Sequence, residues 1–476
     1  MGSKWEKVRL GDYCIKIGSG ATPKGGSSVY TDTGNTYFIR SQNIYNDGFN
    51  TNGLVFINDE AAFKLKNVEV QENDVLINIT GDSVARICIA PGSFLPARVN
   101  QHVAIIRPKS NEFDSRFLRY FLSSPHQQAL LLTLASAGAT RHALTKGMIE
   151  DLQVPKPPLN IQISIANILE FFDKKIEKNN YQNQTLEKMS QTLFKSWFVD
   201  FDPVIDNALD AGNPIPEALQ SRAELRQKVR NCADFKPLPA EIRSLFPSEF
   251  EETELGWVPK GWSIVRTEDI ALKIGMGPFG SNIKVSTFVN AGVPIISGQH
   301  LKDPLLIDGD NNFITPEHAE KLKNSAVYRK DIIFTHAGNI GQVSLIPEDS
   351  EYDRYIISQR QFFLRVNESK SSPYYLIHYF RSEKGQHALL SNASQVGVPS
   401  IARPSTHLKN ISFLNPPMVL LKEFEKFSTP LFHRFSKNRK CGVSLTALRD
   451  TLLPKLISGE LSLEDLPDLT TDTEAA

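Results

Sequence analysis

The sequence predicts an α+β protein in which two similar mixed α/β domains are separated by two long antiparallel coiled-coil helices. Three observations predict this fold class. The chain repeats itself after 257 residues at Trp5 and Trp262 and after 259 residues at Asn179 and Asn438. Each copy begins with short runs rich in Val, Ile and Phe that are separated by turn residues. Each copy ends in a long segment with apolar residues every seven positions.

The repeat covers most of the chain. Its offset drifts by only two residues, which makes chance similarity a poor explanation. The other matching strings are residues 16–18 with 273–275, residues 39–43 with 296–300, Asp74 with Asp331, Gly81 with Gly338, Gln101 with Gln359, residues 120–121 with 379–380, and residues 157–158 with 416–417. The expected parts are a first globule (1–157), a first long helix (158–198), an insert (199–254), a second globule (255–416), a second long helix (417–460) and a disordered tail (461–476).

Composition sets broad bounds on function. Lys+Arg and Asp+Glu both number 53, so any basic surface has to be local. The four cysteines form no CxxC pair, which is typical of a reduced protein without structural zinc. The sequence contains no apolar run near 18 residues and no apolar signal region at its N-terminus. We therefore expect a cytoplasmic protein that neither spans a membrane nor binds a metal.

Within each globule the expected strands and helices are short. In the first, the strand runs are residues 75–79, 87–90 and 103–106, and the helical patterns are residues 113–123 and 127–135. A proline-rich step at 154–159 cannot continue a helix and marks the exit from the globule. The same step recurs before the second long helix.

The first long helix has Ile165, Phe172, Leu186 and Leu193 in one heptad row, with Asn179 in the remaining place. Over residues 160–198 it would be roughly 58 Å long, too long to lie inside one small domain.

The second long helix repeats this row. It contains Phe424, Leu431, Leu445 and Leu452, with Asn438 as the polar member. We hypothesise an intramolecular antiparallel coiled coil in which a contact between Asn179 and Asn438 fixes the register. In the alternative interpretation each helix caps its own globule and both Asn side chains are solvated. Pro430 and Pro454 count against a regular second helix.

The insert at 199–254 is acidic and contains several prolines. It is either a surface connection or a contact surface for a partner.

Two strings resemble catalytic or nucleotide-binding motifs but lack the context those motifs need. Residues 275–280 fit GxGxxG, yet Pro278 interrupts the string and no helical pattern follows. Residues 415–418 resemble an NPP-aromatic loop, but Met418 replaces the aromatic residue. No arrangement of catalytic side chains repeats, and this favours a binding protein.

Two similar globules at a fixed separation suggest a reader of two places on duplex DNA, whose grooves recur about every 34 Å. Gln, Asn and Arg side chains on turns match base edges, and Lys and Arg also contact phosphates. For each candidate taken alone, an ordinary polar group of a turn or strand end is the better explanation. The candidate DNA-binding residues are Lys24, Arg40, Gln42, Asn43, Thr80, Asn100, Gln101, His102, Thr140, Arg141, Lys146, Ser281, Gln299, His300, Asn339, Ser358, Gln359, Arg360, Ser400 and Arg403. The two sets differ at most positions, which predicts an asymmetric target.

Four strings resemble the specificity subunits of type I restriction-modification systems. Two of them lie at the helix ends, at residues 193–203 (LFKSWFVDFDP) and 448–461 (LRDTLLPKLISGEL). The other two lie near the start of the second copy, at residues 255–262 (LGWVPKGW) and 277–281 (GPFGS). The resemblance covers essentially the whole chain. It implies two target-recognition domains, separated by helices, that read a bipartite DNA sequence with a fixed gap.

The resemblance also implies partners. The helices are expected to contact two methyltransferase subunits and, through them, ATP-driven restriction subunits. Phe194, Trp197, Phe198 and Leu453 are our candidates for exposed docking residues, the alternative being packing within the helix pair. No catalysis is expected in this chain, and S-adenosylmethionine, ATP and Mg²⁺ are expected on the partners. Two other functions stay open, namely a specificity subunit of a modification-only or non-cleaving phage-defence methyltransferase and a two-headed scaffold that binds protein.

Overall fold

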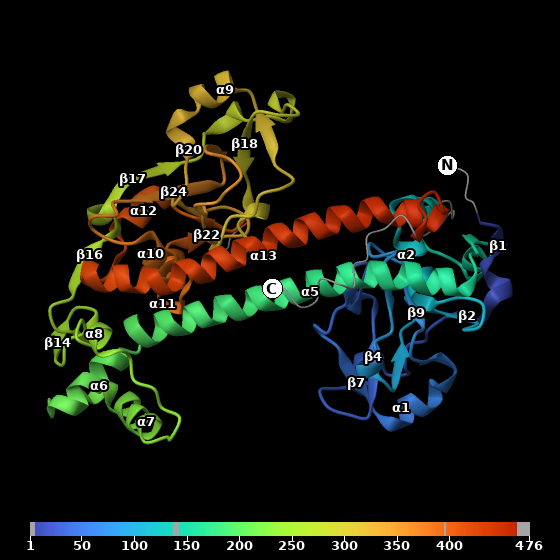
Figure 1. Cartoon of the computed structure of the whole chain (residues 1–476), viewed down its shortest axis with the longest axis horizontal. Helices are drawn as coiled ribbons and strands as arrows, with labels where there is room; N and C mark the ends of the chain where they lie inside the picture. The colour runs from blue at the N-terminus through green and yellow to red at the C-terminus, as the bar shows by residue number, and fades with distance from the viewer. Residues whose placement is uncertain (1–4, 137–141, 395–396, 464–476) are drawn as a thin grey trace. The chain divides into compact units, whose positions relative to one another are not determined.

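The computed structural model describes residues 5–136, 142–394 and 397–463. It divides the chain into two compact units, shown with their elements in Figure 1. Unit 1 comprises Met1–Asn179 with Cys441–Ala476, and unit 2 comprises Asn180–Lys440. Each unit contains one globule and part of both long helices.

Unit 1 contains two main sheets. The first is antiparallel, in the order β10 (Ile87–Ile89), β9 (Val75–Asn78), β12 (Val103–Pro108) and β2 (Cys14–Ser19). The second has the order β3 (Tyr30–Thr31), β7 (Val55–Ile57), β4 (Thr36–Ile39), β11 (Ala97–Val99) and β8 (Glu69–Val70), with β4 and β11 parallel. Two small ladders join β1 (Lys7–Arg9) to β13 (Gln153–Pro155) and β5 (Ile44–Tyr45) to β6 (Gly48–Phe49). The helices of this globule are α1 (Asp59–Lys64), α2 (Ser115–Ser123), α3 (Pro125–Ser136) and α4 (Lys146–Glu150).

Strand β9 is buried on both faces. Its alternate residues Val75 and Ile77 belong to a core shared with helix α2, whereas Leu76 belongs to a core shared with the second sheet. Side chains on a strand point alternately to opposite faces, so one strand supplies both cores. This explains why its sequence is a continuous apolar run.

Unit 2 repeats this architecture. One sheet has the order β17 (Ala271–Met276), β24 (Gln361–Val366), β21 (Ile332–Thr335) and β22 (Val343–Leu345). The other has the order β19 (Asn312–Ile314), β18 (Val293–Ile296), β23 (Tyr355–Ile357) and β20 (Ala326–Val327), with β18 and β23 parallel. Further ladders join β16 (Ser263–Arg266) to β27 (Ser412–Asn415), β14 (Phe250–Thr253) to β15 (Gly256–Pro259), and β25 (Ala393–Ser394) to β26 (Ser400–Ile401). The helices of this globule are α9 (Pro316–Lys321), α10 (Pro373–Arg381), α11 (Glu383–Leu390) and α12 (Pro404–Asn410).

Matching ion pairs support the repeat at the level of single side chains. Arg107 binds Asp74 in unit 1 and Arg365 binds Asp331 in unit 2, each at a shortest distance of 2.7 Å. Both carboxylates also accept a hydrogen bond from the backbone of the turn that precedes them. The two globules therefore share their fold and the details of its turns.

The two long helices are α5 (Leu159–Phe198) and α13 (Met418–Ser458). Helix α13 continues through Pro430 and Pro454. In unit 1 the two helices meet at an ion pair between Asp173 and Arg449. In unit 2 they meet where the ring of Phe194 packs against that of Phe424. In each unit they are antiparallel, because later residues of α5 contact earlier residues of α13.

The predicted contact between Asn179 and Asn438 is wrong. The Asn438 amide donates to Asn183 Oδ1 at 3.0 Å and to Gln182 Oε1 at 3.3 Å. In an antiparallel pair a residue faces its own repeat counterpart only at the midpoint. Asn179 precedes this midpoint in the chain. The seven-residue spacing alone does not reveal where the midpoint lies. A buried Asn–Asn contact is nevertheless present, between Asn438 and Asn183.

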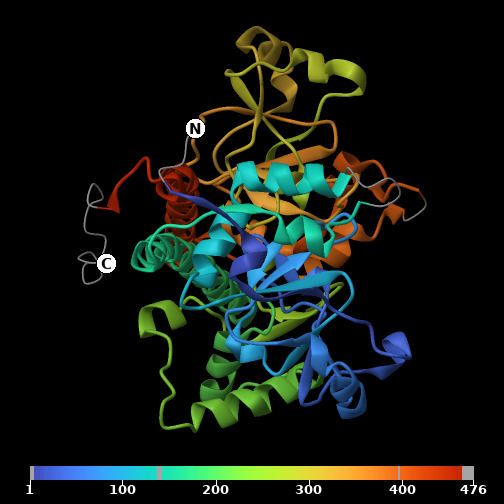
Figure 2. The same ribbon diagram turned by 90° about the vertical axis from the view of Figure 1, so that its right-hand side faces the viewer.

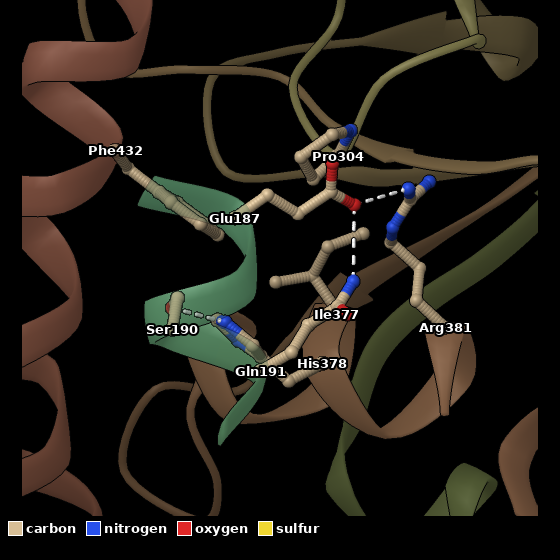
Figure 3. A pocket seen from close by; sticks show the side chains of 8 residues that line it. All are labelled: Glu187, Ser190, Gln191, Pro304, Ile377, His378, Arg381 and Phe432. Carbon is tan, nitrogen blue, oxygen red and sulfur yellow. Dashed lines mark hydrogen bonds and ion pairs between the residues drawn. The ribbon is translucent and has the colours of Figure 1, made fainter. Parts of the chain in front are cut away.

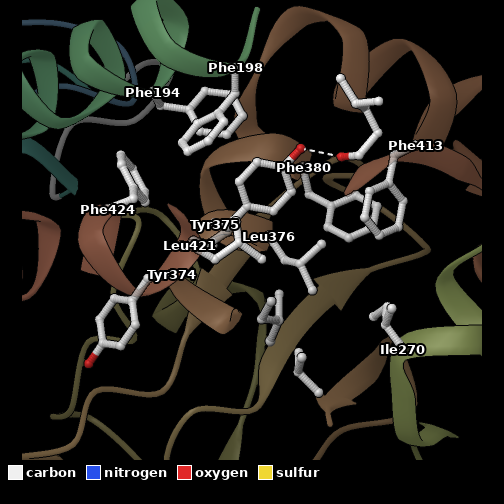
Figure 4. Close-up of a cluster of buried hydrophobic side chains, with 14 of the residues drawn as sticks. Phe194, Phe198, Ile270, Tyr374, Tyr375, Leu376, Phe380, Phe413, Leu421 and Phe424 are labelled. Carbon is white, nitrogen blue, oxygen red and sulfur yellow. Dashed lines mark hydrogen bonds between the residues drawn. The ribbon is translucent and has the colours of Figure 1, made fainter. Parts of the chain in front are cut away.

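The predicted exposure of the helix-end residues is also wrong. Phe194, Trp197, Phe198 and Leu453 are all buried, and Trp197 is 1% exposed. Figure 4 shows Phe194 and Phe198 within the aromatic core of unit 2, where Phe198 packs edge-on against Tyr375 at 5.0 Å. A string of large apolar residues at a helix end does not show whether the chain itself covers them. Here it does.

The insert forms a packed helical element that contains α6 (Asp202–Ala211), α7 (Gln220–Arg230) and α8 (Ala240–Arg243). Helices α6 and α7 lie side by side (Figure 1, Figure 2). The acidic residues of α6 pair with arginines of α7, as Asp202 with Arg222, Asp206 with Arg226, and Asp210 with Arg230. Spacing by four residues places each set on one helix face. The three acidic residues of this face of α6 are thus paired within the insert.

Within the described ranges, every helix is too short or too polar to cross a bilayer.

Candidate nucleic-acid interface

Each globule has a hollow lined mainly by polar side chains. Hollow 1, in unit 1, has a volume of about 940 Å³. It is lined by Ser41, Gln42, Tyr45, Thr80, Gly81, Asp82, Ser83, Val84, Arg86, His102, Leu132, Ser136 and His142. Hollow 2, in unit 2, has a volume of about 340 Å³. It is lined by Ser297, Gly298, Gln299, Lys302, Thr335, Ala337, Asn339, Gln342, Ser358, Arg360 and Gln361.

The two hollows occupy the same place in the repeated fold. Backbone hydrogen bonds establish the correspondence, since Ile79 N–H donates to His102 O and His336 N–H donates to Arg360 O, both at 2.9 Å. His102 of hollow 1 therefore matches Arg360 of hollow 2. The other matched pairs are Ser41 with Gly298, Gln42 with Gln299, Tyr45 with Lys302, Thr80 with Ala337, Asp82 with Asn339, and Arg86 with Gln342.

In hollow 1 several polar groups already have internal partners. The guanidinium of Arg86 lies 4.5 Å from the ring centroid of Tyr45, a cation–π contact that holds it in place. Thr80 Oγ1 lies 2.6 Å from His102 Nδ1, and the two share a hydrogen bond. Gln42 is exposed, with weak contacts of 3.4 and 3.5 Å to the carbonyls of Gly53 and Asn52.

Hollow 2 has more free donors. Lys302, Asn339 and Arg360 are exposed, and within the described chain their side chains make no hydrogen bond or ion pair. Gln342 is held in place: its amide nitrogen donates to Gly298 O, and its amide oxygen accepts from Thr335 Oγ1, both at 3.1 Å. An uncommitted guanidinium and ammonium beside an ordered amide form a site suited to a ligand rich in acceptors.

The structure brings together only part of the predicted DNA-binding set. The members that line a hollow are Gln42, Thr80 and His102 in unit 1, and Gln299, Asn339, Ser358 and Arg360 in unit 2. Gln101 and Gln359 are exposed on the same turns as His102 and Arg360. Lys24, Lys146, Ser400 and Arg403 line neither hollow. Thr140 and Arg141 lie outside the described residues, as does the side chain of Ser281.

Asn43 and His300 are better explained as structural residues. Asn43 is 0% exposed, accepts from Arg40 N–H and donates to Asn50 O. His300 is buried and accepts from Ser297 N–H through Nδ1 at 3.0 Å, and burial lowers its pKa. The two residues match in the repeat and cap the same turn. We therefore assign neither residue to base recognition. The sequence could not distinguish the two roles, because a polar residue that caps a turn and one that contacts a base occur in the same sequence pattern.

Asn100 and Arg40 are also committed elsewhere. Asn100 is buried and accepts from His102 N–H, so it shapes the turn that presents His102. The Arg40 guanidinium donates to Gly53 O and lies 5.5 Å from the ring centroid of Tyr30.

Sequence reasoning missed several residues that line the hollows: Tyr45, Asp82, Arg86, His142, Lys302 and Gln342. A comparison of the repeats would have found the matched pairs Tyr45 with Lys302 and Arg86 with Gln342, because these positions differ within otherwise similar surroundings. Within the described residues no group of His, Cys, Asp or Glu could hold a metal ion.

Comparison with known proteins agrees with this repeated architecture. Residues 2–188 match the family described as "Type I restriction modification DNA specificity domain". The MjaIX specificity subunit of Methanocaldococcus jannaschii is 25% identical over 381 residues, covering 78% of this chain and 74% of the relative. The HindI specificity subunit of Haemophilus influenzae is 24% identical over 477 residues, covering 96% of this chain and 100% of the relative. Residues 2–188 are thereby assigned to the type I restriction-modification DNA specificity domain, and the whole chain is similar to type I specificity subunits.

The fold agrees with this assignment. The crystal structure of a type I restriction-modification S subunit from M. genitalium superposes with a TM-score of 0.54 at 15% identity, covering 95% of this chain and 96% of that one.

Proposed function

We propose that this chain is the non-catalytic specificity subunit of a type I restriction-modification system and binds an asymmetric, bipartite DNA target, with hollow 1 reading one half and hollow 2 reading the other. One observation carries the proposal: the two hollows lie at the same place in the repeated fold but present different side chains. The equivalent position of the two hollows indicates that both have the same kind of function, which we propose is contact with DNA bases. Different side chains suit different base sequences.

The chemistry of hollow 2 favours contact with guanine. A free arginine such as Arg360 can donate two hydrogen bonds to O6 and N7 of guanine. Asn339 can pair with the edge of adenine, while Lys302 suits either guanine or a phosphate.

Hollow 1 offers Gln42, His102 and Thr80, which both donate and accept, together with the carboxylate of Asp82, which can accept from the amino group of cytosine. The two half-sites should therefore differ in composition.

The partners follow from the family. We propose that the chain assembles with two methyltransferase subunits and, through them, with restriction subunits, and that S-adenosylmethionine, ATP and Mg²⁺ bind those partners. A modification-only complex would use the same DNA contacts and differ only in lacking restriction subunits.

The experiment is a methylome. The chain and its cognate methyltransferase subunit are co-expressed in a methylation-free host, and modified bases are mapped by long-read sequencing. A split, asymmetric motif with a constant gap is the expected result. A stable complex without any methylation would contradict the proposal and favour a protein-binding scaffold. In vitro, DNA binding should weaken by orders of magnitude between about 50 and 200 mM salt.

A further inference from the structure

Among the contacts by which each globule packs on the α5–α13 pair of its own unit is a cluster of three side chains, and the two clusters occupy the same repeat positions. Junction 1 consists of Arg119, Asp173 and Arg449. Junction 2 consists of His378, Phe432 and Ser190. The matched pairs are Arg119 with His378, Asp173 with Phe432, and Arg449 with Ser190, each 259 residues apart.

Junction 1 is charged. The Asp173 carboxylate of α5 binds Arg119 of α2 at 3.1 Å and Arg449 of α13 at 2.7 Å. It also accepts a hydrogen bond of 2.7 Å from the hydroxyl of Tyr120. One carboxylate thus ties the globule to both long helices. The Arg119 side chain is only 9% exposed, which makes its ion pair important to local stability.

The three residues of junction 2 carry no charge, and the ion pair between Glu187 and Arg381 lies beside them in the same pocket (Figure 3). The imidazole of His378 stacks on Phe432 with ring centroids 5.3 Å apart and on Phe194 at 5.7 Å. Its Nδ1 donates to Tyr374 O at 2.6 Å, which leaves Nε2 to accept from the Ser190 hydroxyl. Burial lowers the pKa of His378 to about 4, so the ring is neutral near pH 7.

Neither junction can accept the other globule's side chain without loss. An arginine at position 378 would face Phe432 and Ser190 with no carboxylate in the cluster. Glu187, a carboxylate that lines the same pocket, is already bound to Arg381 at 2.7 Å. A histidine at position 119 would leave the Asp173 carboxylate short of a partner. Removing one member of a buried ion pair is strongly destabilising, because the remaining charge is uncompensated.

We infer that the side chains of the two junctions make the packing specific, so that each globule packs stably only on the helix segments of its own unit. This specificity sets the order of the two DNA-binding globules along the chain. The link to reader order rests on the proposed function. The packing specificity itself does not, and it is tested without DNA.

The first test measures thermal unfolding of the full chain. Single substitutions His378→Arg, Phe432→Asp and Ser190→Arg should each lower the melting temperature by about 5 °C or more. The triple variant H378R/F432D/S190R, which recreates junction 1 in unit 2, should recover at least half of the summed loss. If His378→Arg fails to fold, a folded triple variant gives the same support. A triple variant that loses the sum of the single effects, or does not fold, would overturn the inference.

The second test exchanges the two globules within the full chain. One version keeps the native helices, and the other also carries D173F, R449S, F432D and S190R. The version with exchanged junction residues should melt at the higher temperature and, with the methyltransferase subunit, modify a motif whose halves are reversed. Equal melting and equal modification by both versions would overturn the inference. If the wild-type chain gives no methylation at all, the proposed function fails. The comparison of melting temperatures still tests the packing specificity of the two junctions.

Discussion

A single position distinguishes the two hollows most clearly: histidine at 102 and arginine at 360. Both follow the same turn, and both backbone carbonyls accept from the same strand of the repeated sheet. His102 is engaged with Thr80, whereas Arg360 has no internal partner among the described residues. The hydrogen-bond donors of the Arg360 guanidinium are therefore available to a ligand bound in hollow 2.

Replacing Arg360 with alanine should weaken binding of the assembled complex to its DNA target by about 1–3 kcal/mol and relax the base preference in one half-site only. Arg354→Ala is the matched control, because Arg354 pairs with Glu320 and lines neither hollow. Fluorescence anisotropy with single-base variants of the target measures both effects. Equal losses in the two variants would show that Arg360 contributes only bulk charge.

The buried His378 gives a pH prediction. Its folded pKa, lowered to about 4 by burial, lies below the value of about 6.5 for an unfolded histidine. Between these values only the unfolded chain takes up the proton. Stability is therefore full above pH 6.5 and falls as the pH drops towards 4, by about 3 kcal/mol at most.

The variant His378→Phe keeps the aromatic stack and lacks the titrating group, so its loss of stability over the same pH range should be smaller. The ion pair between Arg381 and Glu187 faces the junction in both proteins and cancels in the comparison. Denaturant unfolding at pH 7 and pH 5 measures the difference. Parallel pH profiles for the two proteins would refute this role for His378.

Side-chain roles were the least predictable part of the molecule. The sequence identified polar turn residues, but Asn43 and Gln42 are neighbours with opposite fates, one buried as a cap and the other exposed in a hollow. The difference arises from backbone geometry at the turn, to which the residue type gives no guide.

At the scale of elements, the helical insert is held by ion pairs that repeat every four residues. Arg226 and Asp206 form one of its well-enclosed pairs, with side chains 15% and 11% exposed. Removing Arg226 leaves a mostly buried carboxylate without its main partner.

Arg226→Ala should therefore lower the free energy of unfolding of unit 2 by about 2–4 kcal/mol. Arg266→Ala should cost about 0–1 kcal/mol, because the Arg266 side chain is 52% exposed and its pair with Glu268 lies in solvent. Urea unfolding of both variants provides the comparison. Similar small losses would show that the insert ladder behaves like ordinary surface ion pairs.

The long helices show which element-level features the sequence contains. Heptad spacing predicted α5 and α13, and helix α13 extends through both prolines that counted against it. The proline at position 430 is exposed, where a missing backbone hydrogen bond costs less than in a core. The heptad row that contains Asn179 could not reveal that Asn183 is the partner of Asn438, because Asn183 lies four residues further on, outside that row.

At the scale of the whole molecule, the internal repeat made the fold class accessible from sequence. Its spacing alone paired Asp74 with Asp331 and Gln42 with Gln299, and both pairs occupy matching places in the fold. The position of the hollows was not accessible in the same way. Arg86 and Gln342 reach them from a neighbouring strand, and a contact of that kind depends on tertiary packing.

The repeat also predicts independence of the two readers. Each hollow is built entirely from residues of one unit, so a change in one should leave the other's half-site unaltered.

The most direct test of this account compares methylomes of three complexes that differ only in this chain: the wild type, the hollow 1 variant Q42A/H102A, and the hollow 2 variant Q299A/R360A. We predict that each variant loses or relaxes one half of the split motif, a different half in each case, and that the other half and the gap stay as in the wild type. Changes in both halves from either variant, or an unchanged motif from both, would contradict the account.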